Sequence, residues 1–145
     1  MNTAMNTTTN TTTTTATHRG GCLCGAVCYV VDGELARVTH CHCSMCRKGH
    51  GAAFATYATV RVEQLRFERG EATLGHFHSS PTVIRSFCRD CGSPMLWRDD
   101  TREPGMVAFA LGSLDTPYAE QRIAHIFVAS KAPWHAILDD APQRL

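Results

Sequence analysis

The sequence lacks any apolar run that approaches the roughly 18 to 20 residues needed to span a bilayer as a helix. It also lacks an excess of charge, because 14 Lys and Arg residues stand against 13 Asp and Glu residues and give a formal net charge of +1. So small a net charge creates no strong field for nucleic acid or anionic lipid. We therefore expect that the protein binds neither a membrane nor nucleic acid. The sequence does not indicate an oligomeric state.

The first seventeen residues lack a secretory signal, since no basic start is followed by an apolar stretch of about 7 to 15 residues. They are almost entirely Thr, Asn, Ala and Met, which bury too little apolar surface to offset the entropy of ordering. This composition predicts a disordered tail over residues 1–17 and a single domain over residues 18–145. A cytoplasmic location follows by default, and in that reducing compartment clustered cysteines more often bind metal than form disulfides.

Long helices are not expected, because Gly and Pro interrupt the chain at short intervals. The stretches between them are rich in β-branched and aromatic residues, as is typical of strands. They predict a small, mainly β domain with antiparallel strands near residues 26–31, 53–58, 74–78, 83–87, 95–97, 107–111 and 123–128. Helical turns are expected only near residues 60–65 and 118–122.

Two cysteine pairs share a feature that groups them: each is followed directly by glycine. Tetrahedral zinc places its sulfur ligands about 3.8 Å apart, so each pair needs a tightly curled chain, and glycine permits the positive φ that such a curl requires. The pairs are Cys22 and Cys24 before Gly25, and Cys88 and Cys91 before Gly92. Together they predict a closed, structural four-cysteine zinc site that fastens two distant parts of the domain.

The eighth cysteine, Cys28, is assigned to packing. It has the same face parity as Cys24, but about 13 Å of extended chain separates the two residues, which is too far for one metal ion.

A third cluster, Cys41, Cys43 and Cys46, supplies three thiolates within six residues and is not followed by glycine. Three protein ligands leave one position on zinc open, as in catalytic zinc sites. The alternative is closure by a histidine. His50 and His40 are the candidates, because His42 would point away from Cys41 and Cys43 in an extended segment.

Four runs of the sequence resemble, in order, those of the GFA family, the glutathione-dependent formaldehyde-activating enzyme and centromere-protein-V-like domain. The runs are GGCLCGAVCYVV, HCHCSMCRKGHGAAF, FCRDCGSPM and HIFVASKAPWHAILDDAPQ, and the resemblance covers residues 20–143. It implies a fold of the β-tent type and two zinc ions per chain. One zinc is carried onto Cys22, Cys24, Cys88 and Cys91, and the other onto Cys41, Cys43 and Cys46.

The resemblance also implies an activity: glutathione and formaldehyde combine to S-hydroxymethylglutathione, a reaction classed in reverse as a carbon–sulfur lyase. An open three-thiolate zinc would suit it, since a metal lowers the pKa of a substrate thiol. The alternative is a non-catalytic, zinc-stabilised binding module with two structural zincs.

Four residues are candidates for substrate binding. Arg47 and Lys48 would offset the net negative charge of a three-thiolate zinc or bind a glutathione carboxylate, unless they form a solvated basic turn. Phe54 and Trp134 would form aromatic walls over the second metal, unless they are core aromatics.

Overall fold

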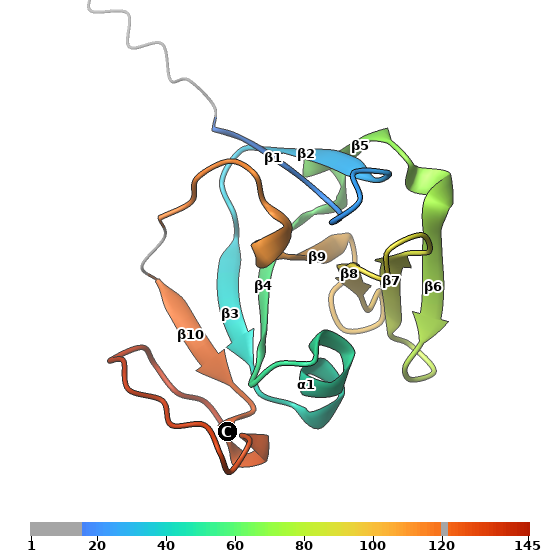
Figure 1. Cartoon of the computed structure of the whole chain (residues 1–145). Helices are drawn as coiled ribbons and strands as arrows, with labels where there is room; N and C mark the ends of the chain where they lie inside the picture. The colour runs from blue at the N-terminus through green and yellow to red at the C-terminus, as the bar shows by residue number, and fades with distance from the viewer. Residues whose placement is uncertain (1–15, 120–121) are drawn as a thin grey trace, which may run out of the picture.

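Two β-sheets form the fold of this computed structural model, which describes residues 16–119 and 122–145. The smaller sheet has the strand order β1 (Thr17–Gly21), β2 (Cys28–Asp32), β5 (Leu65–Arg69). The larger has the order β10 (Ile123–Ile126), β3 (Arg37–Cys41), β4 (Ala55–Arg61), β9 (Met106–Ala110), β8 (Pro94–Arg98), β7 (Ile84–Cys88), β6 (Leu74–His78). Figure 1 shows the smaller sheet across one end of the larger, and helix α1 (Ser44–His50) beyond the other end of β4.

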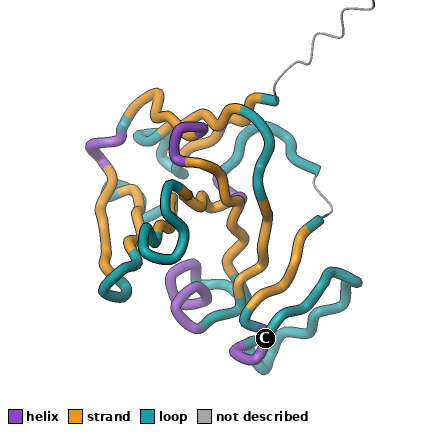
Figure 2. Tube along the Cα trace, turned by 180° about the vertical axis from the view of Figure 1, so that it is seen from behind, coloured by secondary structure: helices purple, strands orange, loops and turns teal. Residues whose placement is uncertain are grey.

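Helical structure is limited to short segments in the part of the chain that the structure describes (Figure 2). Besides α1 these are the single turns η1 (Val62–Gln64), η2 (Glu71–Thr73), η3 (Leu111–Ser113) and η4 (Val128–Ser130). None of the helices within residues 16–119 and 122–145 combines the length and the apolar character needed to cross a membrane.

The prediction of a mainly β fold is confirmed, and each of the predicted stretches overlaps a strand. The helical turn predicted at residues 60–65 is η1, whereas the one at 118–122 includes residues outside the described ranges. The predicted tail also lies outside them, apart from its last two residues, and β1 already begins at Thr17.

One strand corrects the expectation of a wholly antiparallel domain. β10 runs parallel to β3, with His125 opposite His40 and Ile126 opposite Cys41. Parallel neighbours need a long connection, which the chain between β3 and β10 provides. This pairing puts the C-terminal part of the chain beside the strand that carries Cys41.

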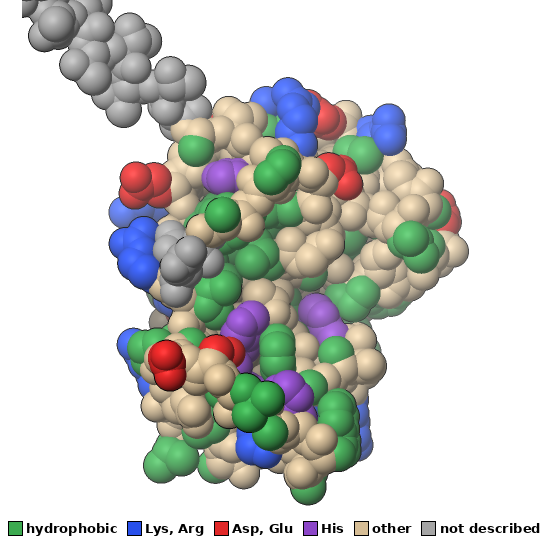
Figure 3. Space-filling view, turned by 60° about the vertical axis from the view of Figure 1, so that its left-hand side comes forward, with side chains coloured by type: hydrophobic (Ala, Val, Ile, Leu, Met, Phe, Trp, Pro, Cys, Tyr) green, Lys and Arg blue, Asp and Glu red, His purple; other side chains and the backbone are tan. Residues whose placement is uncertain are grey.

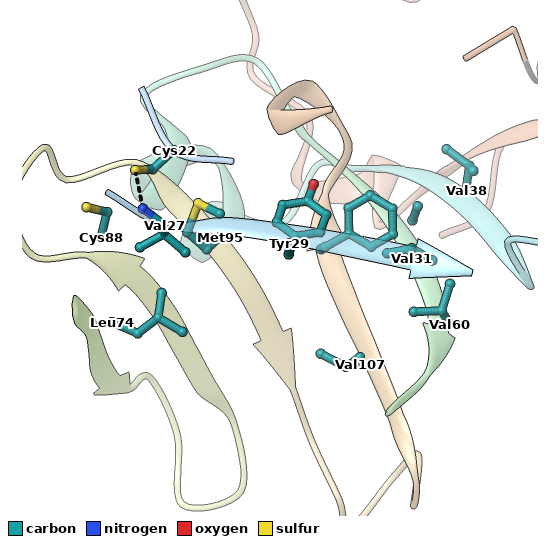
Figure 4. Packing of buried hydrophobic residues seen from close by; sticks show 12 residues of the cluster. Cys22, Val27, Tyr29, Val31, Val38, Val60, Leu74, Cys88, Met95 and Val107 are labelled. Atoms are coloured by element: carbon teal, nitrogen blue, oxygen red, sulfur yellow. Dashed lines mark hydrogen bonds between the residues drawn. The ribbon is translucent and has the colours of Figure 1, made fainter. Parts of the chain in front are cut away.

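The core lies between the smaller sheet and the larger one. β2, which β1 and β5 flank within its sheet, buries Tyr29, Val30 and Val31 completely. Tyr29 and Val31 belong to the core cluster together with side chains of the larger sheet. The Tyr29 ring packs against Phe109 with 5.5 Å between centroids, and its hydroxyl lies 2.7 Å from the Ser113 hydroxyl. In Figure 4, Cys22 and Cys88 lie beside Met95 at one end of this row of side chains. The core is therefore continuous with the first cysteine cluster.

Gly70 offers a test of how tightly the smaller sheet is closed. Its φ is 76°, and a Cβ built on it would lie 1.9 Å from the carbonyl oxygen of Ala26. We expect Gly70→Ala to lower the free energy of unfolding by about 2 kcal/mol or more, since backbone strain and a backbone clash add. Urea denaturation measures this loss.

Two matched glycines serve as controls. Gly105 has φ 73° with no atom within 4 Å of an added Cβ, so Gly105→Ala isolates the cost of the left-handed backbone, about 1 kcal/mol. Gly112 has similarly open surroundings without a left-handed φ, and Gly112→Ala should change stability by less than about 0.5 kcal/mol. Equal losses in all three variants would contradict the close approach at Gly70.

Candidate functional site

The structure brings the four cysteines of the first cluster together. Their sulfur atoms all lie within 4.8 Å of one another. Cys22 and Cys24 lie in the loop from β1 to β2, Cys88 ends β7, and Cys91 lies in the turn to β8. The Sγ–Sγ distances are 3.6 Å for Cys22 and Cys24 and 3.8 Å for Cys24 and Cys88. These separations match those of tetrahedral thiolate ligands and are far from the roughly 2.05 Å of a disulfide.

The glycines after the two pairs have the positive φ that the sequence predicts, 77° at Gly25 and 76° at Gly92. Their amides do not point at sulfur, however: they donate to the carbonyl oxygens of Cys22 and Cys88, which closes the two turns. The sulfur of Cys22 instead accepts a hydrogen bond of 3.2 Å from the Val27 amide. The curled chain and its hydrogen bonds thus direct the sulfurs to one point.

One member of this cluster is strongly activated. The Ser93 hydroxyl, followed by backbone amides, lowers the pKa of Cys91 to about 6, so its thiolate is available at neutral pH. A set of four convergent soft sulfur ligands fits a metal ion such as zinc.

The second cluster is built where β3 ends and α1 begins. Cys41 is the last residue of β3, Cys43 is the N-cap of α1, and Cys46 lies in its first turn. The Cys43 sulfur accepts a hydrogen bond of 3.2 Å from the Cys46 amide, in the place of a usual oxygen cap. All three sulfurs lie within 4.8 Å of one another, so this group too could hold a metal ion.

The three thiols are not equivalent. Hydrogen bonds from the Cys41 and Cys46 thiols, the Cys46 amide and the charge of Arg85 lower the pKa of Cys43 far below its usual value. The same contacts with Cys43 and Cys46, together with burial, raise the pKa of Cys41. These contacts therefore favour the thiolate form at Cys43, the form in which cysteine binds a metal ion.

No histidine joins the second cluster within the residues that the structure describes. His40 is hydrogen-bonded to the Thr56 hydroxyl at 2.8 Å, and His50 to the Tyr57 hydroxyl at 2.9 Å. Among the described His, Cys, Asp and Glu residues, none adds a fourth ligand atom to the three sulfurs. The arrangement favours an open fourth position over closure by His40 or His50.

A pocket of about 360 Å³ opens onto the second cluster. The alternation of β3 directs Arg37, Thr39 and Cys41 into it, and Cys43 follows in the same parity. Other strands add Tyr57, Arg85 and Trp97, and Phe127 lies at the exposed rim.

The backbone of Phe127 is strained. Among the described residues, Phe127 is the non-glycine residue with a positive φ, 56°. Backbone strain of this kind is often found at functional sites. The residues that line the pocket combine thiols, apolar side chains and cations, as a binding site for a small molecule does.

The cation that contacts the cluster is Arg85 of β7, which the sequence reasoning did not identify. Its Nη1 and Nη2 both lie 3.7 Å from the Cys46 sulfur, and its Nε donates to the Ser79 hydroxyl at 2.9 Å. The alternation of a strand could have predicted that Arg85 and Phe87 share a face, but nothing in the sequence links β7 to Cys46.

The four predicted substrate residues lie outside the lining of this pocket. Arg47 donates from Nε to the His42 carbonyl at 3.3 Å, and Lys48 is exposed on α1. Trp134 is 73% exposed. Phe54 lines a separate hollow together with His50. The structure thus brings Arg85, and not these residues, to the three sulfurs.

The opposite face of β3 carries a histidine cluster. His42 and His125 are buried and lie 2.8 Å apart, from Nε2 to Nδ1, and His125 Nε2 lies 3.2 Å from the Asp139 carboxylate. Phe54 packs against both imidazole rings. His42 and His125 themselves are hidden from the surface, whereas other histidines are visible beside apolar side chains in Figure 3.

Burial, followed by the charges of neighbouring histidines and Lys131, lowers the pKa of His42 to about 4. At neutral pH this ring is uncharged. As the sequence predicts, His42 points away from Cys41 and Cys43, and it contacts the C-terminal part of the chain through His125.

Comparison with known proteins gives the following matches. The family model described as glutathione-dependent formaldehyde-activating enzyme matches residues 17–130. A protein of Colletotrichum graminicola, provisionally named a glutathione-dependent formaldehyde-activating enzyme, is 28% identical over 75 residues, which are 52% of this chain and 39% of that protein. The chain thus spans well under half of that relative. A crystal structure of a Rhodobacter sphaeroides protein is similar with 31% identity and a TM-score of 0.58, over 69% of this chain and 90% of that one.

Removal of one buried sulfur tests the first cluster. We expect Cys88→Ser to lose one metal ion per chain and several kcal/mol of stability, because a structural metal site contributes directly to folding. Elemental analysis and thermal unfolding measure the two effects.

Cys28→Ser is the matched control, since Cys28 belongs to neither cluster and its thiol donates a hydrogen bond to the Gly25 carbonyl, at 3.6 Å. It should keep both metal ions and most of the stability. If Cys88→Ser keeps the full metal content, the first cluster is not a metal site.

Proposed function

Because this chain belongs to the family of the glutathione-dependent formaldehyde-activating enzyme, with the family model matching residues 17–130, we propose that it adds the thiol of glutathione to formaldehyde or a related small aldehyde. In reverse this is a carbon–sulfur lyase reaction. The reaction takes place at the pocket over Cys41, Cys43 and Cys46, and one observation carries the proposal: these three sulfurs converge at the pocket without a fourth ligand atom among the described residues.

The proposal includes two zinc ions per chain with different roles. Four convergent sulfurs at Cys22, Cys24, Cys88 and Cys91 suit a closed structural site. Three sulfurs beside a pocket suit a site that exchanges its fourth ligand. When bound at the second cluster, zinc supplies Lewis acidity that lowers the pKa of a thiol beside it.

The protein residues then orient the reactants. The thiol loses its proton, its sulfur forms a bond to the carbonyl carbon, and the carbonyl oxygen receives the π electron pair and a proton. Burial raises the pKa of the Tyr57 phenol, so its hydroxyl stays protonated on the pocket wall. With His50 Nε2–H as the donor in the 2.9 Å contact between the two residues, the Tyr57 hydroxyl can donate its own proton to the aldehyde oxygen. Trp97 and Phe127 add apolar surface to the pocket wall, which would reduce the water around the reactants.

Several expectations remain predictions beside this proposal. They are the single domain over residues 18–145, the cytoplasmic location, and substrate contacts by Arg47, Lys48, Phe54 and Trp134. Because none of these four residues lines the pocket, binding by them requires that glutathione extend beyond it.

Spectroscopy on cobalt-substituted protein tests the proposed reaction site. We expect a sulfur-to-cobalt charge-transfer band that grows as glutathione is added, because the added thiolate completes the coordination sphere. Carbon-13 NMR of labelled formaldehyde should show faster exchange with S-hydroxymethylglutathione. Cys43→Ser should reduce that exchange at least a hundredfold, since it removes a sulfur of the reacting centre, while Cys28→Ser should leave it unchanged.

A protein that is loaded with two metal ions but shows neither the band nor faster exchange at millimolar glutathione would contradict the enzyme. Two metal ions that chelators remove equally slowly would then support a binding module with two closed sites.

A further inference from the structure

The environment of Arg85 differs from that of the other arginines in the pocket. Arg37 pairs with Glu103, and Arg102 pairs with Asp99 at 3.4 Å. Arg85 has no carboxylate partner among the described residues, and both of its terminal nitrogens are directed at one sulfur, Cys46 Sγ. Its charge is therefore available to the three-cysteine group.

The position of Arg85 is fixed from two sides. Its Nε donates to the Ser79 hydroxyl, and in β7 it lies opposite Trp97 of β8 and Phe77 of β6. It is only partly accessible to solvent, so its charge is screened less than that of a surface arginine. A guanidinium fork held in this way can direct two N–H groups at one acceptor, which an ammonium on a flexible stem does less well.

The contact between Arg85 and Cys46 affects the net charge of the three-cysteine group when a metal ion is bound. Three thiolates around a divalent ion carry a net charge of about −1, which repels an approaching thiolate at short range. The Arg85 guanidinium cancels this charge at the sulfur that it contacts. Hydrogen bonds from outside the ligand set also orient the ligands themselves, and their loss commonly reduces metal affinity or activity about 10- to 100-fold.

We propose that Arg85 is a positioning and specificity residue of the three-cysteine centre: it orients Cys46 and makes the centre accept an anionic thiolate in preference to a neutral ligand. This inference rests on the proposed function in one respect, namely that a thiol binds at this group. It does not require that the thiol be glutathione or that the aldehyde be formaldehyde.

The test compares three ligands on cobalt-substituted protein. Glutathione and 2-mercaptoethanol bind as thiolates, and only glutathione has carboxylates, whereas imidazole binds as a neutral ligand. In Arg85→Gln we expect the affinity for both thiols to fall tenfold or more, while the affinity for imidazole changes less than threefold. Arg85→Lys should recover part of the thiol affinity, because it restores the charge without the fork.

Arg98→Gln is the matched control. Arg98 lies on the neighbouring strand β8 and pairs with Asp100 at 2.8 Å, and it does not line the pocket. Its replacement should leave all three affinities unchanged. Retention of the metal ion at the four-cysteine cluster and an unchanged circular dichroism spectrum show that each variant is folded. If Arg85→Gln does not fold, the affinities are measured with Arg85→Lys instead.

Each contrary result has a distinct meaning. If the affinities for thiols and imidazole fall by the same factor, Arg85 is merely structural and the inference is wrong. If only the affinity for glutathione falls, Arg85 binds a substrate carboxylate, and its role in accepting thiolates is also wrong. If 2-mercaptoethanol binds as expected but glutathione never does, the role of Arg85 stands and the proposed substrate is wrong.

Discussion

The two sheets meet where four cysteine sulfurs from two separate parts of the chain converge. Cys22 and Cys24 leave the smaller sheet and meet Cys88 and Cys91, which form the turn between β7 and β8 of the larger sheet. Four thiols within 4.8 Å of one another cannot all ionise without strong mutual repulsion, so a bound cation would stabilise the approach of the two sheets. Tyr29 and Phe109 fill the space next to this junction, and the core is thereby closed at one end by sulfur and at the other by apolar side chains.

The end of β3 places the second cysteine cluster at the wall of a pocket. The side chains of β3 alternate between two environments. Its odd-numbered residues Arg37, Thr39 and Cys41 line the pocket. On the other face, His40 packs against Phe54, and His42, just beyond the strand, packs against His125. The parallel pairing of β10 with β3 holds the C-terminal part of the chain against the histidine face. The cysteine face is left open to the pocket, where β7 contributes Arg85.

Local patterns in the sequence predict the strands and the cysteine pairs well, because both depend on neighbouring residues. The apolar, aromatic and β-branched residues of β4, β6 and β9 are local features, and so is the glycine that lets each CxC or CxxC turn curl. β1, β3 and β5 escape prediction. Gly20, Gly21 and His40 are not typical strand residues, and β5 is rich in charged residues. The place of these strands in the sheets comes from their pairing partners. Helix α1 escapes because its N-cap is Cys43, a residue that reads first as a metal ligand.

The second cluster and the pocket around it are built from two kinds of residue: cysteines that are close together in sequence, and pocket residues that are distant from them. The cysteines define where a metal ion and a thiol could meet, but most of the other residues that line the pocket are distant from them in sequence and are brought there by tertiary structure. Arg47 and Lys48 adjoin Cys46 in sequence, yet α1 directs them away from the pocket, whereas Arg85 is distant in sequence and contacts the Cys46 sulfur. If Arg85 acts as proposed, the charge balance at the centre depends on a residue of β7 that lies outside the cysteine pattern.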